Sequence, residues 1–204
     1  MELLKKLFTW PSIKPTVEKN DHKWLDVPNM LVLNDVISDI NPKYILELGS
    51  WTGAGSTKHI LDKAKNAYLV CIDHWSTNEK DYIQDEFGAD QVKEISEHIK
   101  TLWEVFLLNT WDYQDRLTPV RAKTTEGLKI LGKLNIPFDL VYIDAHHDYK
   151  SVLHDITMVY KFWPNAIIVG DDYTWNSVKK AVHEFADGNN LEVVVNGNCW
   201  YYKK

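Results

Sequence analysis

Short runs of apolar residues alternate along the chain with longer segments in which apolar residues recur every three or four positions. The short runs have the length of buried strands, and the longer segments have the periodicity of amphipathic helices. Strands that alternate with helices in this way predict βαβ units and a parallel sheet. The predicted strands lie at 44–46, 68–72, 119–121, 140–143 and 166–169, and the predicted helices at 30–40, 56–64, 126–134 and 152–163.

The end of the chain has a different pattern. Two apolar runs, 191–195 and 199–202, flank the tripeptide 196–198, which has the sequence Asn-Gly-Asn. An Asn-Gly dipeptide between two such runs is typical of a β-hairpin. The fold class predicted from the whole pattern is therefore α/β and Rossmann-like, with a mostly parallel seven-stranded sheet that ends in a C-terminal antiparallel hairpin.

The length of 204 residues suits a single domain with one buried core, which we expect to span 1–204. Residues 1–26 are polar and contain two prolines, which predicts an irregular lead-in segment. The segment 74–118 is far longer than the usual connection between two strands, and its part 91–106 has a helical pattern. We expect this insertion to cover the active site, because long insertions at that end of a parallel sheet commonly do so.

Composition narrows the class of protein. Hydrophobic residues make up 45% and charged residues 25% of the chain, which is ordinary for a globular protein, and the net charge of −6 argues against a nucleic-acid partner. Cys71 and Cys199 lie in apolar stretches and are expected to be buried free thiols in a reducing compartment. No apolar run reaches the length of a membrane span, so we expect a cytoplasmic protein without a membrane partner. A homo-oligomer is compatible with these features.

A glycine-rich turn follows the first predicted strand. Gly49 and Gly53 would let the backbone approach a ligand closely, and Ser56 begins the next helix, where backbone N–H groups are unpaired. No Gly-Lys-Ser/Thr sequence follows, which argues against a phosphate-binding P-loop. A dinucleotide fingerprint fits poorly, because its third glycine position is occupied by Lys58.

Two acidic residues indicate which cofactor the turn would bind. Glu47 ends the strand before the turn, where a carboxylate would repel a pyrophosphate but suits the charged amino-acid end of S-adenosylmethionine, directly or through water. Asp73 ends the second strand, where an acidic side chain can accept hydrogen bonds from both ribose hydroxyls. The pair therefore favours S-adenosylmethionine as the cofactor over a ligand-free tight turn.

Three more carboxylates are predicted at the same edge of the sheet. Asp144 closes one strand, and Asp171 with Asp172 closes the next. Carboxylates that converge in this way repel one another unless a cation neutralises them, and oxygen ligands suit Mg²⁺ or Ca²⁺, with Mn²⁺ as a further candidate. The alternative is that Asp171 or Asp172 only caps the helix that begins near Asn176.

Four segments together resemble a known family. They are 47–53 (Glu-Leu-Gly-Ser-Trp-Thr-Gly), 72–75 (Ile-Asp-His-Trp), 143–149 (Ile-Asp-Ala-His-His-Asp-Tyr) and 170–173 (Gly-Asp-Asp-Tyr). In this order they resemble the class I S-adenosylmethionine-dependent methyltransferases. More narrowly, they resemble the metal-dependent O-methyltransferases that include the macrocin (sugar) type.

The resemblance implies a set of site residues. Asp144, Asp171 and Asp172 fall on the metal-ligand positions of the family. Thr124 would lie near the adenine, and Trp75 would stack on the cofactor beside Asp73. The expected cofactor contacts are Glu47, Gly49, Ser50, Trp51, Gly53, Ser56, Asp73, His74, Trp75, Thr124 and Asp144.

A base must accept the proton of the acceptor hydroxyl as the methyl group is transferred. His146 and His147 follow Asp144 closely, and imidazole suits this role near neutral pH. The family often has aspartate at the position of His146, whereas His147 falls on its usual histidine position. Alternation along an extended strand end would place His146 on the side of Asp144 and turn His147 away, so we expect His146 to be the base.

These features predict an S-adenosylmethionine-dependent, metal-assisted O-methyltransferase that acts on a hydroxyl of a sugar, a glycan or another small polar molecule. The alternatives are a nicotinamide-dependent oxidoreductase and a non-catalytic carbohydrate-binding domain. Aromatic residues near the predicted site, which could hold a sugar ring, are Trp103, Trp111, Tyr113 and Trp175. Trp103 has a helical spacing with Phe106, which favours a place in the core instead.

Overall fold

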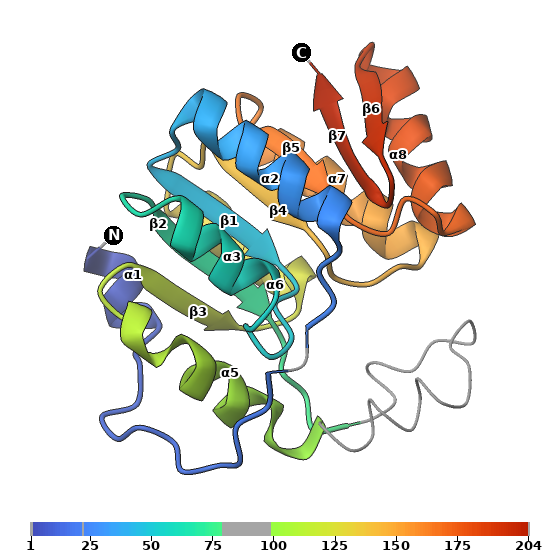
Figure 1. Cartoon of the computed structure of the whole chain (residues 1–204). Helices are drawn as coiled ribbons and strands as arrows, with labels where there is room; N and C mark the ends of the chain where they lie inside the picture. The colour runs from blue at the N-terminus through green and yellow to red at the C-terminus, as the bar shows by residue number, and fades with distance from the viewer. Residues whose placement is uncertain (1, 22, 79–98, 204) are drawn as a thin grey trace.

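The computed structural model describes residues 2–21, 23–78 and 99–203 and contains a seven-stranded sheet between two layers of helices (Figure 1). The strands are β1 (Tyr44–Leu48), β2 (Tyr68–Asp73), β3 (Leu117–Arg121), β4 (Leu140–Ile143), β5 (Ile167–Gly170), β6 (Glu192–Asn196) and β7 (Cys199–Lys203). The helices are α1 (Glu2–Leu7), α2 (Val27–Ile40), α3 (Ser56–Lys63), α5 (Leu102–Thr110), α6 (Thr124–Lys133), α7 (Tyr149–Phe162) and α8 (Asn176–Asn189), with short 3-10 helices η2 (Ile99–Thr101) and η3 (Trp111–Tyr113).

The order of the strands in the sheet is β3-β2-β1-β4-β5-β7-β6. Strands β1 to β5 pair in parallel, and β7 runs antiparallel to both β5 and β6. This confirms the predicted fold class. The order reverses at β1, which lies between β2 and β4. In sheets of this kind ligands bind beyond the carboxyl ends of the strands at such a reversal.

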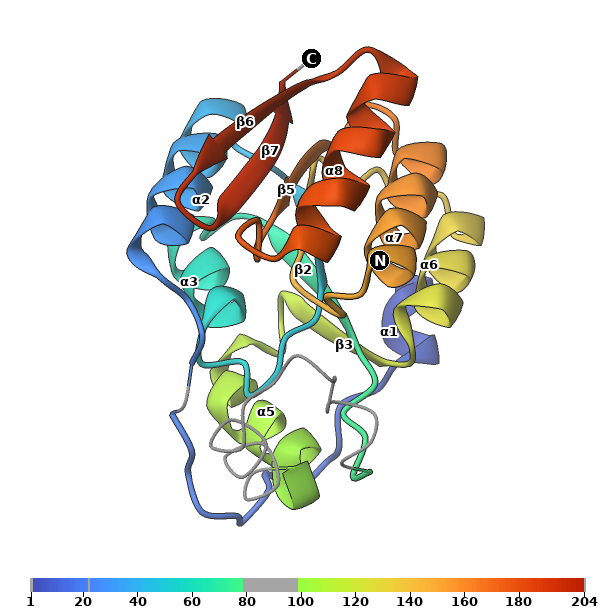
Figure 2. The ribbon, with the colours of Figure 1, turned by 90° about the vertical axis from the view of Figure 1, so that its right-hand side faces the viewer.

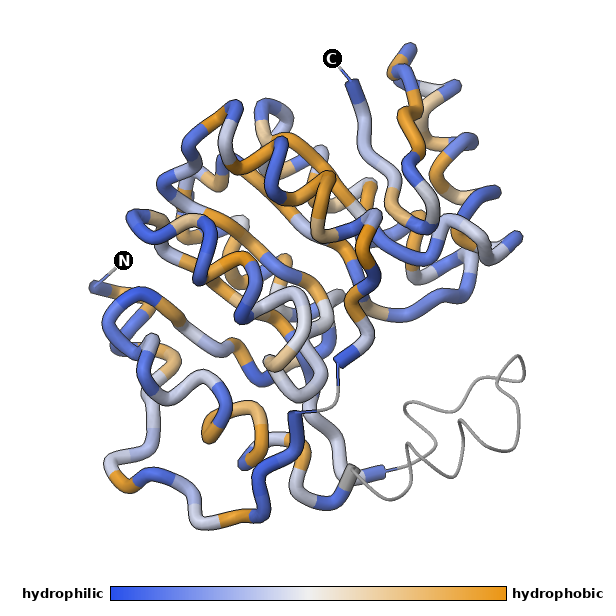
Figure 3. Tube along the Cα trace, in the orientation of Figure 1, coloured by the Kyte–Doolittle hydropathy of each residue, from blue (hydrophilic) through white to orange (hydrophobic). Residues whose placement is uncertain are grey.

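Alternation along the strands divides the core into two clusters. Leu46 and Leu48 pack with α1, α6, α7 and α8 on one face of the sheet, whereas Ile45 and Tyr142 pack with α2, α3 and α5 on the other (Figure 2). The strands are accordingly hydrophobic over most of their length, and the helices carry polar residues on their outer sides (Figure 3). Both faces are covered, so the edge formed by the strand ends is where a ligand can enter.

The N-terminal part differs from the prediction of an irregular lead-in. Residues 2–7 form α1, which buries Leu4 against the core. Helix α2 starts earlier than the apolar pattern indicates, because the carboxylate of Asp26 accepts the backbone N–H of Asn29 and Pro28 occupies the first turn. The residues between α1 and α2 have no helix or strand in the described part of the chain.

Part of the predicted insertion helix at 91–106 lies outside the described residues. Within the described part, α5 begins at Leu102 and packs Phe106 and Leu107 into the core on the α2 and α3 face. The role of 74–118 as a cover of the site stays a prediction.

The C-terminal hairpin turns one residue later than an Asn-Gly turn would. Asn196 pairs with Cys199, so Gly197 and Asn198 are the central residues of the turn. Gly197 has a φ of +61°, which suits the first central position of a tight hairpin turn that glycine prefers. Cys71 and Cys199 are both buried and unbridged, as predicted. None of the helices in 2–21, 23–78 and 99–203 is long and apolar enough to cross a membrane.

Candidate active site

A cavity of about 320 Å³ opens at the carboxyl ends of β1, β2 and β4. Its walls are the glycine turn after β1, the end of β2, the start of α6 and residues 144–147 after β4. Lys23 and Trp24, from the segment before α2, also line it, and the Trp24 ring stacks on Trp51 with centroids 5.1 Å apart. Eight of the predicted cofactor residues line this cavity: Gly49, Ser50, Trp51, Ser56, Asp73, His74, Thr124 and Asp144.

The glycine turn lies directly against the end of β4. Gly49 has a φ of +80°, and a Cβ atom at this position would lie 1.8 Å from the carbonyl oxygen of Asp144. Only glycine permits both this backbone conformation and this approach. The turn and Asp144 therefore share one wall of the cavity.

Glu47 lies beneath the turn and does not line the cavity. Its Oε2 atom accepts hydrogen bonds from Ser50 Oγ at 2.8 Å, Thr57 Oγ1 at 2.6 Å and Cys71 Sγ at 3.0 Å. Burial raises the pKa of Glu47, and these hydrogen bonds oppose the rise. The carboxylate thus joins the turn to β2 and to the first turn of α3.

Asp73 also organises the turn. One oxygen of its carboxylate accepts the backbone N–H groups of Ser50 at 2.9 Å and Trp51 at 3.0 Å, and the other accepts the N–H of Trp75 at 2.8 Å. The side chain also lines the cavity. The sequence pattern indicated Asp73 as a site residue. Its hydrogen bonds to the turn could not be predicted, because they depend on how β1 and β2 lie side by side.

The indole of Trp75 lies in the core rather than in the cavity. Its ring is fully buried against Trp103 and Phe106, with centroids 4.8 Å and 4.4 Å away, and its Nε1 donates to the carbonyl of Trp51. The expected stacking of this ring on a cofactor therefore has no support in the structure. The helical spacing of Trp103 correctly indicated a core position. Gly53 is likewise buried and lies against Phe106.

Thr124 lines the cavity at the start of α6, and Asp155 of α7 lies behind it. The side chain of Thr124 opposes the rise in the pKa of Asp155 that burial causes. Asp155 is 2% exposed, and its Oδ1 has no hydrogen-bond partner among the described residues. Burial raises the pKa of Asp155 from 3.8 to about 7.

The raised pKa of Asp155 predicts how the stability of the protein depends on pH. An acid with a raised pKa keeps its proton in the folded state, so its stabilising contribution is complete below pH 3.8 and is lost as the pH rises to about 7. We expect Asp155→Asn to increase the free energy of unfolding by about 1–3 kcal/mol at pH 8, and by less at pH 5. Urea denaturation at both pH values measures this. Asp187→Asn, at an exposed position of α8, is the control, and an equal effect of both substitutions would contradict the interpretation.

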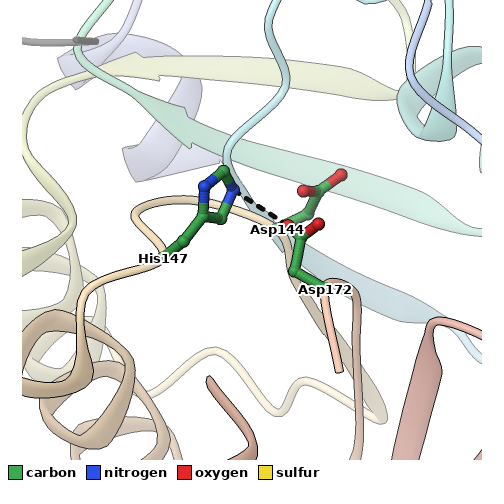
Figure 4. Close-up of side chains that lie close together, drawn as sticks. All are labelled: Asp144, His147 and Asp172. Carbon is green, nitrogen blue, oxygen red and sulfur yellow. Dashed lines mark ion pairs between the residues drawn. The ribbon is translucent and has the colours of Figure 1, made fainter. Parts of the chain in front are cut away.

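Asp144, His147 and Asp172 form a cluster at the ends of β4 and β5 (Figure 4). One ligand atom from each residue lies within 4.8 Å of the others, and His147 Nε2 is 2.9 Å from Asp172 Oδ2. Two carboxylates and an imidazole at these separations can hold a divalent cation.

The electrostatics of the cluster fit a cation. Burial raises the pKa of Asp144 well above its usual range, and the charges of Asp171 and Asp172 raise it further. Burial and the charge of Asp172 raise the pKa of Asp171 to about 6. A bound cation would stabilise the ionised carboxylates that burial and mutual repulsion disfavour.

In the part of the chain that the structure describes, Asp171 does not belong to the cluster. Its Oδ1 accepts the backbone N–H of Asp172 at 2.6 Å and Asn198 Nδ2 at 2.9 Å, and its Oδ2 accepts Tyr142 Oη at 3.3 Å. Neither acid caps α8, because that helix begins after Trp175 without a side-chain cap. The geometry therefore favours His147 over Asp171 as the third ligand.

The two histidines point differently from the expectation based on strand alternation. Strand β4 ends at Ile143, so the extended geometry does not continue to 146 and 147. His147 lies in the cluster with Asp144, and the expectation that it turns away is wrong. His146 also lines the cavity, with its ring 5.9 Å from that of His74, and burial followed by the charge of His74 lowers its pKa.

The other aromatic residues expected near the site, Trp111, Tyr113 and Trp175, have different surroundings. Trp175 lies beside His147, with ring centroids 4.8 Å apart. Trp111 packs edge-on against Trp10, and the Tyr113 hydroxyl donates to Asp62. None of Trp111, Tyr113 and Trp175 lines the cavity among the described residues, but Trp175 contacts a residue of the cluster, His147.

Residues 46–173 match the model of the family described as "Methyltransferase domain". The match covers more than half of the chain and includes the glycine turn, the cluster and all the cavity-lining residues except Lys23 and Trp24. The protein belongs to this methyltransferase family. No curated protein matches the chain.

Solved structures share the fold at low sequence identity. An O-methyltransferase from Bacillus cereus in complex with SAH is 16% identical, with a TM-score of 0.55, and the alignment covers 89% of this chain and 83% of that one. Cofactor-bound Rv0187 from MTB is 17% identical, with a TM-score of 0.57 over 98% and 84% of the two chains. The SAH-bound Podospora anserina methyltransferase PaMTH1 is 15% identical, with a TM-score of 0.53 over 86% and 78%.

Proposed function

We propose that the protein transfers the methyl group of S-adenosylmethionine to a hydroxyl oxygen of a sugar or another small polar molecule, with the assistance of a divalent cation. The observation that carries the proposal is that the cofactor cavity and the candidate cation cluster share Asp144 and His147. An acceptor that contacts the cluster would therefore lie next to the cofactor.

The cavity matches the cofactor in its chemistry. Asp73 and Thr124 both line the cavity. In the proposal Asp73 would accept hydrogen bonds from the ribose hydroxyls, Thr124 would lie beside the adenine, and the amino-acid end would lie over the glycine turn. The SAH in the Bacillus cereus and Podospora anserina structures supports this assignment, because those proteins share the fold. Glu47 would act from beneath the turn by holding Ser50 and α3 in place.

The cluster suits a cation that accepts both oxygen and nitrogen ligands. A divalent cation held by Asp144, His147 and Asp172 would lower the pKa of an acceptor hydroxyl and fix the position of its oxygen. The imidazole favours Mn²⁺ or another transition metal over Ca²⁺, and Mg²⁺ remains compatible with the two carboxylates.

His146 is proposed as the general base. It lines the cavity next to Asp144, and its lowered pKa keeps the imidazole neutral and able to accept a proton at pH 7. The proton of the acceptor hydroxyl would move to a ring nitrogen of His146 as the oxygen bonds to the methyl carbon and the bond from that carbon to the sulfonium sulfur breaks. S-adenosylhomocysteine and the methylated acceptor would then leave.

A sugar is the favoured acceptor because of Trp175. Its ring lies beside His147, and an aromatic face can pack on the apolar C–H face of a sugar while the polar rim reaches the cluster. Screening sugars and other hydroxyl compounds by mass spectrometry for the gain of one methyl group would identify the acceptor. The two buried thiols are consistent with a cytoplasmic location, which is part of the proposal.

Ligand-dependent melting tests the proposal against its alternatives. A ligand that binds only the folded state raises the melting temperature. We expect S-adenosylhomocysteine to raise it and NAD to leave it unchanged, and EDTA to lower it in protein that carries a cation. A rise with NAD alone would favour the oxidoreductase alternative, and no response to either cofactor would contradict the proposal.

Asp73→Ala should weaken the binding of S-adenosylhomocysteine. The substitution removes the proposed ribose acceptor and also the bonds to the N–H groups of Ser50 and Trp51, each at a charged carboxylate. We expect a loss of about 1.5–3 kcal/mol in calorimetry. Asp73→Asn keeps one carbonyl acceptor and should have a smaller effect. Unchanged affinity of the alanine variant would exclude Asp73 from the cofactor site.

A further inference from the structure

Asn198 connects the C-terminal hairpin to the loop that carries Asp171 and Asp172. Its Nδ2 group donates to Asp171 Oδ1 at 2.9 Å and to Asp172 Oδ1 at 3.3 Å. Its Oδ1 atom accepts the backbone N–H and the hydroxyl of Thr174, at 3.0 and 2.7 Å, and its carbonyl accepts the N–H of Tyr173 at 2.9 Å. One residue of the turn therefore contacts every residue of the loop from 171 to 174.

The contact to Asp172 acts on a side chain of the candidate cation cluster. Asp172 Oδ1 accepts from Asn198, whereas Oδ2 faces His147 at 2.9 Å. Asp172 also has a φ of +61°, a backbone conformation that costs free energy in residues other than glycine and persists only where the surroundings impose it. The hydrogen bonds from Asn198 to the residues on both sides of Asp172 supply such surroundings.

The same turn holds Asp171 away from the cluster. Asp171 Oδ1 accepts from Asn198, and its carbonyl accepts from Trp200 Nε1 at 2.9 Å. On the other side, Tyr142 donates to Asp171 Oδ2 and accepts from Asn29 Nδ2 at 3.1 Å. Both oxygens of Asp171 are thereby engaged within the protein, which leaves Asp172 as the acid of this loop that faces His147.

We propose that Asn198 is a positioning residue that orients Asp172 toward the divalent cation, so that the C-terminal hairpin determines the affinity of the cation site. The inference rests on the proposed function, because it requires a cation at Asp144, His147 and Asp172. It goes beyond the family match, which ends at residue 173 and does not include the hairpin.

The test compares Asn198→Ala with Asn196→Ala, the latter at an exposed position of the same turn. Mn²⁺ binding is measured by electron paramagnetic resonance titration, and S-adenosylhomocysteine binding by calorimetry without a cation. We expect Asn198→Ala to weaken Mn²⁺ binding about 10- to 100-fold, as is usual for residues that orient metal ligands. The affinity for S-adenosylhomocysteine should stay within about twofold, because Asn198 does not line the cavity.

Two outcomes would overturn the inference. In the first, Asn198→Ala binds Mn²⁺ with the same affinity as Asn196→Ala. In the second, Asn198→Ala loses as much affinity for S-adenosylhomocysteine as for Mn²⁺, which would indicate general damage to the fold. If the wild-type protein binds no Mn²⁺, the proposed cation site itself is wrong and the inference falls with it. The wild-type titration therefore separates the two failures.

A measurement on the wild-type protein applies even if Asn198→Ala does not fold. The side-chain amide resonances of Asn198 and Asn196 are followed by NMR during titration with Mg²⁺. We expect the Asn198 amide to shift along the same saturation curve as the His147 ring, while the Asn196 amide stays in place. An Asn198 amide that does not respond to saturating Mg²⁺, while His147 does, would contradict the inference.

Discussion

Removal of divalent cations is expected to reduce methyl transfer about 10²–10⁴-fold, because a cation contributes several kcal/mol of stabilisation where charge develops on the acceptor oxygen. The structural reason is that Asp144, His147 and Asp172 converge within 4.8 Å beside the cofactor cavity. Turnover is measured as formation of S-adenosylhomocysteine with the acceptor that the methyl-gain screen identifies. EDTA should reduce turnover by this factor, and Mn²⁺ or Mg²⁺ in excess should restore it.

Substitutions in the cluster provide the matched control. Asp144→Asn and His147→Ala should each weaken Mn²⁺ binding and raise the cation concentration that gives half-maximal turnover. Lys23 lines the cavity but is not among the residues of the cluster, so Lys23→Met should leave the cation dependence unchanged. Full turnover in excess chelator, after thorough removal of metal, would show that the cation has no part in the reaction.

His146→Ala is expected to lower turnover about 10²–10⁴-fold, the usual contribution of a general base. Binding of Mn²⁺ should stay near the wild-type value, because His146 is not among the residues of the cluster. Wild-type turnover should decline on the acid side of pH 6.5, since burial and His74 lower the pKa of His146 below that value. Turnover against pH at saturating cation measures both effects.

The neighbouring histidine distinguishes the two roles. His147→Ala should lose cation affinity, and its turnover should recover in part at high Mn²⁺ concentration. His146→Ala should not recover under any cation concentration. If His146→Ala keeps wild-type turnover and the decline at low pH, while His147→Ala loses both, then the roles are reversed.

Much of the fold could be predicted from the sequence because the relevant signals are local. The apolar runs that became β1, β2 and β4 have strand length, and both faces of each strand are buried, which a continuous apolar run indicates. The hairpin was predicted from its asparagines and glycine. Helix α1 was missed because it is six residues long and buries only Leu4, which gives no periodic pattern to detect.

The sequence predicted which acids lie at the strand ends of the candidate site, but not which side chains form the cluster. Asp73 is the last residue of its strand, and Asp144 and Asp172 come within two residues of the ends of theirs. Because these strands are parallel, the three acids meet at one edge of the sheet. That His147 rather than Asp171 completes the cluster could not be predicted from the sequence. It depends on the direction of the backbone after β4 and on the φ of +61° at Asp172. Asn198 was visible only as a turn residue, since its partners lie 24 to 27 positions away in the sequence.

Two buried side chains show the same limit of prediction from the sequence. Glu47 and Trp75 occupy positions that suggested contact with the cofactor, yet one supports the glycine turn from beneath and the other fills the core. A pattern along the chain gives the strand and the approximate depth of a residue. Which of two packed neighbours its side chain faces is decided by tertiary contacts.

The proposed cofactor and cation sites are tested most directly by a crystal structure of the protein grown with S-adenosylhomocysteine and Mn²⁺, with data collected at the manganese absorption edge. We expect S-adenosylhomocysteine in the cavity, with its ribose at Asp73 and its sulfur toward Asp144. We also expect an anomalous peak bounded by Asp144, His147 and Asp172, within about 2.0–2.6 Å of the ligand atoms. S-adenosylhomocysteine bound outside the cavity, or manganese bound away from these three residues while the cluster stays empty, would contradict the proposed sites.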